Sequence, residues 1–123
     1  MKLQDIYDYF AHPPVTFLAL EQAVCYVLSV LLEGELYPSE LLRRLEREYP
    51  TYRMSDIILF NALNFLEGVG ALTSYREKAE GRGRPRRMYQ LTDEWQGEAE
   101  KLAQLWHTSA AKQRSEQSKL ALA

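Results

Sequence analysis

The chain has 123 residues, of which 46% are hydrophobic and 26% are charged, the balance of one folded domain rather than of a disordered segment. A single cysteine excludes an internal disulfide framework, and two distant histidines argue against a structural zinc site. The longest mainly apolar stretch, residues 17–32, is interrupted by Glu21 and Gln22, so we expect no membrane partner and a cytoplasmic location.

The first 16 residues are predicted to form a short N-terminal arm. They include Tyr7, Tyr9 and Phe10 and end with Pro13 and Pro14, which block a helix and favour an extended path. We expect this aromatic arm to add to an interface with a second copy of the chain.

Two helices are predicted to follow the arm. Thr16 is expected to cap a first helix over residues 17–33, in which apolar side chains recur at spacings of three and four, and Gly34 is expected to end it. A second helix over residues 39–49 stops there because Pro50 disfavours the helical conformation in the residue before it.

Ser55 is expected to cap a third helix over residues 56–68, which a helical wheel divides into two faces. The buried face is predicted to hold Ile58, Leu59, Ala62, Leu63, Phe65, Leu66 and Val69. The outer face is predicted to hold Asp56, Ile57, Phe60, Asn61, Asn64 and Glu67. Asparagine amides pair well with adenine, and Ile57 or Phe60 can touch a thymine methyl group. The alternative is that the asparagines are solvated surface and that Phe60 packs against the following hairpin or the arm.

In the final third of the chain the periodicity of the sequence changes from that of a helix to that of a strand. This change predicts a β-hairpin, with strands over residues 71–78 and 87–91 and a glycine-rich tip between them. Residues 76–87 hold six basic and two acidic side chains, on a chain whose formal net charge is −2. A dense positive patch of this kind suits contact with DNA phosphates or with the minor groove. Four arginines carry this prediction: Arg82, Arg84, Arg86 and Arg87. The alternative is a solvated tip without a partner.

A fourth helix is predicted over residues 92–112, with Thr92 as its cap and a frayed tail over residues 113–123. Large side chains recur along one narrow seam of this helix, and we expect the seam to pair with a second copy of the chain. The predicted dimer interface consists of Trp95, Ala99, Leu102 and Trp106. The alternative is that the seam folds back onto the first helix of its own chain.

The predicted order of elements is that of a winged helix, mainly α with a small β-hairpin as the wing and with a C-terminal dimerisation helix. Residues 17–91 form the predicted DNA-binding domain, in which the second and third helices make the helix-turn-helix. Arg43, Arg44 and Arg47 on the second helix either contact DNA or form surface ion pairs with neighbouring glutamates. The residues predicted to contact DNA are Arg53, Ser55, Ile57, Asn61, Asn64, Arg82, Arg84, Arg86 and Arg87.

The wing also carries a resemblance to a known family. Residues 81–92 read Gly-Arg-Gly-Arg-Pro-Arg-Arg-Met-Tyr-Gln-Leu-Thr, which is similar to the wing of the PadR family of winged-helix regulators, and residues 31–34 and 40–45 resemble its first two helices. The likeness extends over about residues 17–107. The family's third helix usually carries a Leu-Tyr-Pro segment, whereas this chain has Asp-Ile-Ile-Leu-Phe at residues 56–60, so the target DNA sequence does not transfer.

The resemblance implies a dimeric transcription factor and, in its nearest likeness within the family, a repressor of a clock-gene promoter. It implies that the fourth helix pairs with its mate, that residues 55–64 recognise the DNA sequence and that Arg82 to Arg87 contact the DNA backbone. The C-terminal region of the family is often longer than here, so a small-molecule effector is not evident, and no cofactor is expected.

An enzyme is not expected, because the sequence offers no converging nucleophile, base and oxyanion donor. Cys25 lies beside Val24 and Val27 in the first helix, which favours a core thiol over a nucleophile. The competing function is a winged helix that binds only other proteins, since a fold does not determine a function. The acidic net charge favours this competing function, and the basic wing opposes it.

Overall fold

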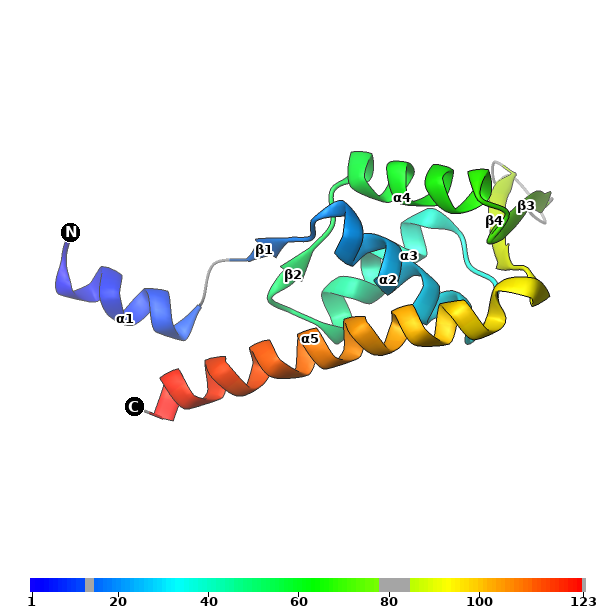
Figure 1. Cartoon of the computed structure of the whole chain (residues 1–123). Helices are drawn as coiled ribbons and strands as arrows, with labels where there is room; N and C mark the ends of the chain where they lie inside the picture. The colour runs from blue at the N-terminus through cyan, green and yellow to red at the C-terminus, as the bar shows by residue number, and fades with distance from the viewer. Residues whose placement is uncertain (13–14, 78–84, 123) are drawn as a thin grey trace.

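The structure is a computed structural model that describes residues 1–12, 15–77 and 85–122, with side chains described up to Lys112 (Figure 1). Its elements in chain order are α1 (Leu3–Ala11), β1 (Thr16–Phe17), α2 (Leu20–Leu31), α3 (Pro38–Glu48), β2 (Tyr52–Arg53), α4 (Asp56–Gly68), β3 (Leu72–Glu77), β4 (Arg86–Leu91), a 3-10 turn (Asp93–Trp95) and α5 (Gln96–Leu122). This order confirms the predicted winged helix with a C-terminal helix. α5 continues to Leu122, past the predicted helix end at residue 112.

Helix α2 is the centre of the fold, with α4 along one side and α5 along the opposite side (Figure 1). Every residue from Tyr26 to Leu31 is buried. A helix that is buried on most of its circumference needs neighbours on several sides, and α3, α4 and α5 supply them. Ser29 lies in this buried run, and its hydroxyl is satisfied by donating to the Tyr26 carbonyl at 2.6 Å. None of the described helices is long and apolar enough to cross a membrane.

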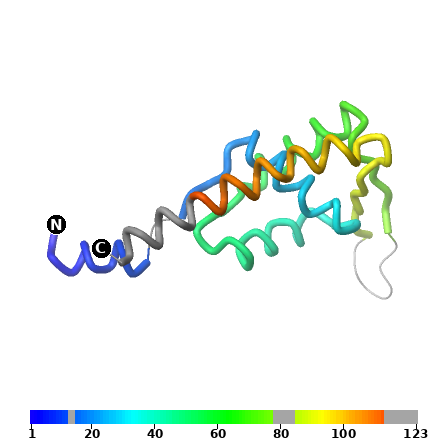
Figure 2. The backbone as a smooth tube through the Cα atoms, turned by 60° about the horizontal axis from the view of Figure 1, so that its bottom comes forward, coloured from blue at the N-terminus to red at the C-terminus, as the bar shows by residue number. Residues whose placement is uncertain are grey.

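The N-terminal arm holds a helix over residues 3–11, which was not predicted, and the prolines at which an extended path was expected lie outside the described residues. At the start of α1 the backbone N–H of Lys2 donates to Asp5 Oδ2 at 2.8 Å. The prolines that motivated the extended prediction come after this helix, so they limit its length without preventing it. α1 buries none of its side chains and stands apart from the body of the molecule in both views (Figures 1 and 2).

Thr16 does not cap α2, because it belongs to a short strand. Its N–H donates to the Thr51 carbonyl at 2.7 Å, and β1 pairs in parallel with β2. α2 begins four residues later than Thr16, where the side chain of Gln22 accepts from the Ala19 N–H at 2.9 Å. The helix ends at Leu31, before the predicted end.

The predicted hairpin is confirmed as the wing, with β3 and β4 paired antiparallel. Leu36, in the loop between α2 and α3, adds a bridge to Tyr89 through two backbone hydrogen bonds of 2.9 and 3.3 Å. Thr92 stands at the predicted N-cap position of the following 3-10 turn, but its hydroxyl forms no cap hydrogen bond and instead donates to the carbonyls of Gly70 and Ala71 at 2.9 and 3.1 Å. This threonine therefore ties the end of the wing to the turn after α4.

The seam predicted as a dimer interface packs inside its own chain. Ala99 is fully buried and Trp106 is 2% exposed, while Trp95 and Leu102 are partly buried against the same core. The Trp106 ring lies 5.1 to 5.4 Å, centroid to centroid, from three tyrosine rings: Tyr26, Tyr49 and Tyr52. Ala99 and Trp106 are therefore corrected as interface residues, because α2 and its neighbours already cover them, while Trp95 and Leu102 keep part of their surface. A homodimer stays a prediction, and it needs surface beyond this seam.

Candidate nucleic-acid interface

Helix α4 is positioned by local hydrogen bonds at both of its ends. Ser55 Oγ accepts from the Ile58 N–H at 3.2 Å, which confirms the predicted cap. Beyond the C-terminal end, Gly70 has a φ of +85°, a conformation that residues with a side chain rarely adopt, and the Ala71 N–H donates to the Leu66 carbonyl at 2.8 Å. The direction of α4 relative to the wing is set by these contacts.

The outer face of α4 is open, as predicted. Asn61 and Asn64 are exposed, and the apolar side chains of Ile57 and Phe60 are 73% and 62% exposed. Large apolar side chains this open, grouped on one helix face, are typical of a surface that another molecule covers.

The predicted buried arc of α4 is too wide. Leu59, Ala62, Leu63 and Leu66 are buried. Phe65 and Val69, which were predicted to join them, are exposed. The core covers α4 along one stripe, and these two residues lie beyond the edge of that stripe.

Arg53, predicted to contact DNA, is engaged in the turn between α3 and α4. Its Nη1 donates to the carbonyls of Pro50 and Tyr52, both at 2.8 Å, and its Nε lies 3.3 Å from Glu46 Oε1. The guanidinium group therefore shapes the helix-turn-helix from within the turn.

Arg87 joins the wing to α4. Its Nε donates to Ser74 Oγ at 3.0 Å, and its Nη2 lies 3.7 Å from Glu67 Oε2 on α4. The Ser74 hydroxyl in turn donates to the same Glu67 oxygen at 3.3 Å. This pairing was not predictable from the sequence, because it depends on how the wing docks on α4. Arg82 and Arg84 lie outside the described residues.

A second contact between the wing and the helix-turn-helix centres on Tyr37, the residue before α3. The guanidinium carbon of Arg86 lies 4.5 Å from the centroid of the Tyr37 ring and that of Arg43 lies 6.0 Å from it, while Arg43 Nη2 donates to Tyr37 Oη at 3.1 Å. On β3 the Tyr75 hydroxyl donates to Glu35, and this hydrogen bond raises the pKa of Tyr75. Both strands of the wing therefore hold the loop between α2 and α3.

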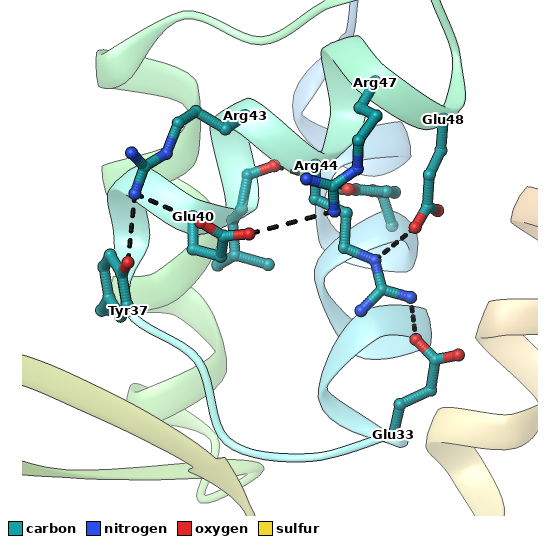
Figure 3. Close-up of polar contacts among 9 residues, drawn as sticks. Glu33, Tyr37, Glu40, Arg43, Arg44, Arg47 and Glu48 are labelled. Atoms are coloured by element: carbon teal, nitrogen blue, oxygen red, sulfur yellow. Dashed lines mark hydrogen bonds and ion pairs between the residues drawn. The ribbon is translucent and has the colours of Figure 1, made fainter.

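Arg44 on α3 has the surroundings of a structural ion pair (Figure 3). It pairs with Glu33, and its Nε lies 2.6 Å from Glu48 Oε1. Burial disfavours the charged form, but the hydrogen bonds from Arg44 to Glu48 and Glu33 outweigh it and raise the pKa of the guanidinium. For this arginine the surface ion-pair alternative is the one the structure supports.

Arg43 and Arg47, in contrast, share a single carboxylate (Figure 3). Their nearest nitrogens lie 3.2 and 3.9 Å from Glu40, and their side chains are 61% and 65% exposed. Pairs as open as these are weakened by solvent, so the two guanidinium groups stay accessible to another anion.

The helix-turn-helix and the wing line an open, largely apolar cavity of about 420 Å³. α3 lines it with Pro38 and Leu42, α4 with Phe60, and β4 with Arg87 and Tyr89. Burial raises the pKa of Tyr89. Because all three elements meet at this cavity, the outer edge of α3, the first turns of α4 and the wing belong to one face. No histidine, cysteine and carboxylate group suited to a metal ion occurs within the part of the chain that the structure describes.

Two solved structures resemble this chain along most of its length. The circadian clock associated protein Pex from Anabaena is 54% identical with a TM-score of 0.81, and the match covers 93% of this chain and 99% of that one. Pex from Synechococcus sp. (strain PCC 7942) is 47% identical with a TM-score of 0.80, covering 89% of this chain and 97% of that one.

A third structure shares the fold at low identity. PadR from Bacillus subtilis, solved in complex with operator DNA, is 23% identical with a TM-score of 0.54, and the match covers 67% of this chain and 45% of that one. No curated protein sequence matches the chain. The sequence profile described as the transcriptional regulator PadR-like family matches residues 27–101. The wing motif, the winged-helix fold and this match agree, and the chain belongs to the PadR-like family of transcriptional regulators.

Proposed function

We propose that this protein is a dimeric, sequence-specific repressor that binds double-stranded DNA at a clock-gene promoter. Membership of a family of transcriptional regulators and 54% identity to the clock-associated Pex from Anabaena support this role. The Bacillus subtilis PadR structure shows that a protein of this fold can hold operator DNA. The observation that carries the proposal is the open outer face of α4, with two asparagines between exposed apolar side chains and an arginine-rich wing nearby.

Helix α4 is the element that reads base edges in this proposal. An α-helix fits the major groove, and Asn61 and Asn64 are three residues apart on the exposed face, where each amide can pair with an adenine. Ile57 is open enough to cover a thymine methyl group. The carboxylate of Glu67 does not oppose DNA here, because Arg87 and the wing pair with it. Asp56 stands in the first turn of α4, where the positive end of the helix dipole offsets its charge.

The wing supplies the sequence-independent part of the affinity. Outside residues 76–87 the chain has a formal charge of −6, so a polyanion would be repelled without the wing. The tip arginines Arg82 and Arg84 have glycine neighbours, which allow the backbone to approach the DNA closely. We propose that residues 17–91 act as the DNA-binding domain, in which α4 gives the specificity and the wing gives the affinity.

The wing proposal is tested by a mobility-shift titration at several salt concentrations. Replacing Arg82 and Arg84 by alanine removes up to four phosphate contacts per dimer, so the slope of log affinity against log salt should fall by up to about 3.6. A salt slope that is unchanged in a folded variant would favour the competing function, a winged helix that binds only proteins. A control for loss of charge elsewhere is Lys101→Ala, which removes one positive charge from an exposed side chain of α5, the helix on the side of α2 opposite to α4 (Figure 1).

The dimer interface is proposed to lie outside the buried seam. α1 exposes Leu3, Tyr7 and Phe10, and Leu105 is exposed on the outward side of α5. A second copy of the chain would cover these apolar side chains, which the single chain leaves in water. Sedimentation equilibrium should give twice the mass of the 14.3 kDa chain, and Leu105→Glu should lower the dimer's stability. A 14.3 kDa species at micromolar concentration would contradict the dimer.

A further inference from the structure

We propose that Tyr37, Arg43 and Arg86 form a second phosphate-binding site, which holds one backbone phosphate of the duplex that α4 reads. The inference rests on the proposed DNA-binding function and adds to it a contact that the tip of the wing does not supply. It explains why two arginines from different elements, α3 and β4, converge on one tyrosine ring.

The cluster brings hydrogen-bond donors from three side chains to one place. Arg86 lies over the Tyr37 ring, with its guanidinium carbon 4.5 Å from the centroid. Arg43 donates through Nη2 to Tyr37 Oη at 3.1 Å, which leaves the hydroxyl proton of the tyrosine free to be donated in turn. Each guanidinium has five N–H donors, so both keep donors for an additional acceptor. An oxyanion with several acceptor oxygens, such as a phosphate, matches this set.

Among the described residues, the ion pairs of this cluster leave a net positive charge, although Glu77 stands opposite Arg86 in the β3–β4 register. Glu40 is shared between Arg43 and Arg47, and Arg86 adds a third positive charge, so these four side chains carry a net charge of +2. Two like charges beside one aromatic ring repel each other, and an anion placed between them would remove that cost. Arg44 on the same helix shows the opposite arrangement, because two carboxylates pair with it. The arginines at Tyr37 therefore keep the positive charge needed to bind an anion, which Arg44 does not.

The position of the cluster identifies that anion as part of DNA. Tyr37 directly precedes Pro38, and Arg86 directly precedes Arg87; Pro38 and Arg87 both line the cavity between α3, α4 and the wing. The cluster therefore stands at the rim of the face from which the outer side of α4 projects. A duplex that takes α4 into its major groove carries its sugar-phosphate strands along the two edges of that groove. In this arrangement one of those strands passes the N-terminal end of α3 and the base of the wing.

The test is the salt dependence of DNA binding by the full chain carrying Arg43→Gln. This change removes the charge from an exposed side chain and keeps its polar character, so circular dichroism and thermal unfolding should be unaltered. If Arg43 binds a phosphate, the slope of log affinity against log salt should fall by about 0.9 per chain. The loss should be the same on the best site and on random DNA, because a phosphate contact carries no sequence information.

Lys101→Gln is the matched control, since it removes the same charge from an exposed side chain of α5, the helix on the side of α2 opposite to α4 (Figure 1). A slope for Arg43→Gln equal to that of Lys101→Gln would overturn the site. Tyr37→Phe keeps the ring under Arg86 and removes only the hydroxyl. We expect it to lower the affinity for the best site and for random DNA equally, with the salt slope retained. An unchanged affinity would mean that the Tyr37 hydroxyl does not belong to the site. If the wild type and the Arg82/Arg84 wing variant both bind without salt dependence, the proposed function fails as a whole. If only the wing variant loses slope, the second site alone fails.

Discussion

Helices α4 and α5 pack on opposite sides of α2, and their large side chains differ in burial. On α5 the aromatic seam is closed, with Trp106 enclosed by the rings of Tyr26, Tyr49 and Tyr52. On α4 the side chain of Ile57 is 73% exposed, and the asparagines of the same face are exposed as well. The periodic spacing of apolar side chains therefore predicts an amphipathic helix in both cases. It does not predict which part of the molecule, or which partner, covers each face.

The difference shows which helix is a structural element and which one presents a surface. α5 uses its large side chains to hold α2 and the end of α3, so this part of the helix contributes to the stability of the single chain. α4 buries only a stripe of small and aliphatic side chains and leaves larger ones in water. Keeping apolar groups in water has a free-energy cost, and contact with another molecule recovers it.

The comparison is tested most strongly by truncating one large side chain on each helix. Trp106→Ala should lower the free energy of unfolding by about 3–5 kcal/mol, because it empties the centre of the ring cluster. Ile57→Ala should change it by less than about 0.5 kcal/mol, because the side chain is already in water. Urea unfolding followed by circular dichroism measures both changes. Equal losses in the two variants would contradict the division between the helices.

A milder variant at the same position separates packing from hydrogen bonding. Trp106 Nε1 is buried and has no hydrogen-bond partner among the described residues. Trp106→Phe therefore removes no such bond and keeps an aromatic ring, so it should cost clearly less than Trp106→Ala. A loss as large as that of the alanine variant would mean that the indole N–H has an acceptor in solution.

The second prediction concerns the polar residues of the open face. Replacing Asn61 and Asn64 by alanine should cost about 1–3 kcal/mol of affinity on the best site and leave binding to random DNA nearly unchanged. Gln104→Ala is the matched control, because it removes an exposed amide from α5. Fluorescence anisotropy with a specific and a random duplex provides both affinities. If the double variant weakens both duplexes equally, this face does not read bases.

The third prediction concerns the cap that holds α4. Ser55→Ala removes the acceptor of the Ile58 N–H and should lower the free energy of unfolding by about 1 kcal/mol. Ser55→Asp retains an acceptor and should restore most of that loss. If Ser55 acts on DNA instead, the alanine variant would lose affinity without losing stability in thermal unfolding.

The smallest effect on stability is expected from a change of pH, through a tyrosine of the ring cluster around Trp106. Burial raises the pKa of Tyr26 above its ordinary value of 10.0, and nearby Glu48 adds to this. The unfolded chain therefore loses this proton at a lower pH than the folded chain, so stability is complete below about pH 10 and falls as the pH rises above it. Tyr26→Phe should make the alkaline loss of stability shallower. The same alkaline slope in both proteins would exclude Tyr26 as its source.

Local signals made the core of this fold predictable. The Ser55 cap, the glycine-containing turn after α4 and the hairpin each depend on residues that are close in the sequence. The strand at Thr16 was missed because its partner, Tyr52, is 36 residues away and no short pattern shows the pairing. The contacts of Arg87 with Glu67 were missed for the same reason, since they form only when the wing docks on α4.

The seam of α5 shows a different limit. The spacing of its apolar residues correctly indicated a face that must be buried. A second chain was expected to bury this face, and the first helix of the same chain was the alternative. Trp106 fits among three tyrosines that come from α2, the end of α3 and β2, so the choice depended on the whole fold. In the candidate interface, likewise, the exposed asparagines were predictable, whereas the cluster at Tyr37 requires α3 and β4 to meet.

The most direct test of the account is the sequencing of genomic DNA fragments captured by the intact protein, alongside the Asn61→Ala and Asn64→Ala double variant. We expect the wild type to enrich a small set of sites, each with two half-sites related by two-fold symmetry and spaced by about one helical turn, 34–36 Å, or a multiple of it. The double variant, with its wing intact, should still bind DNA but without this enrichment. Fragments recovered without any common site by the wild type, or the same sites recovered by both proteins, would contradict the claim that α4 reads the DNA sequence.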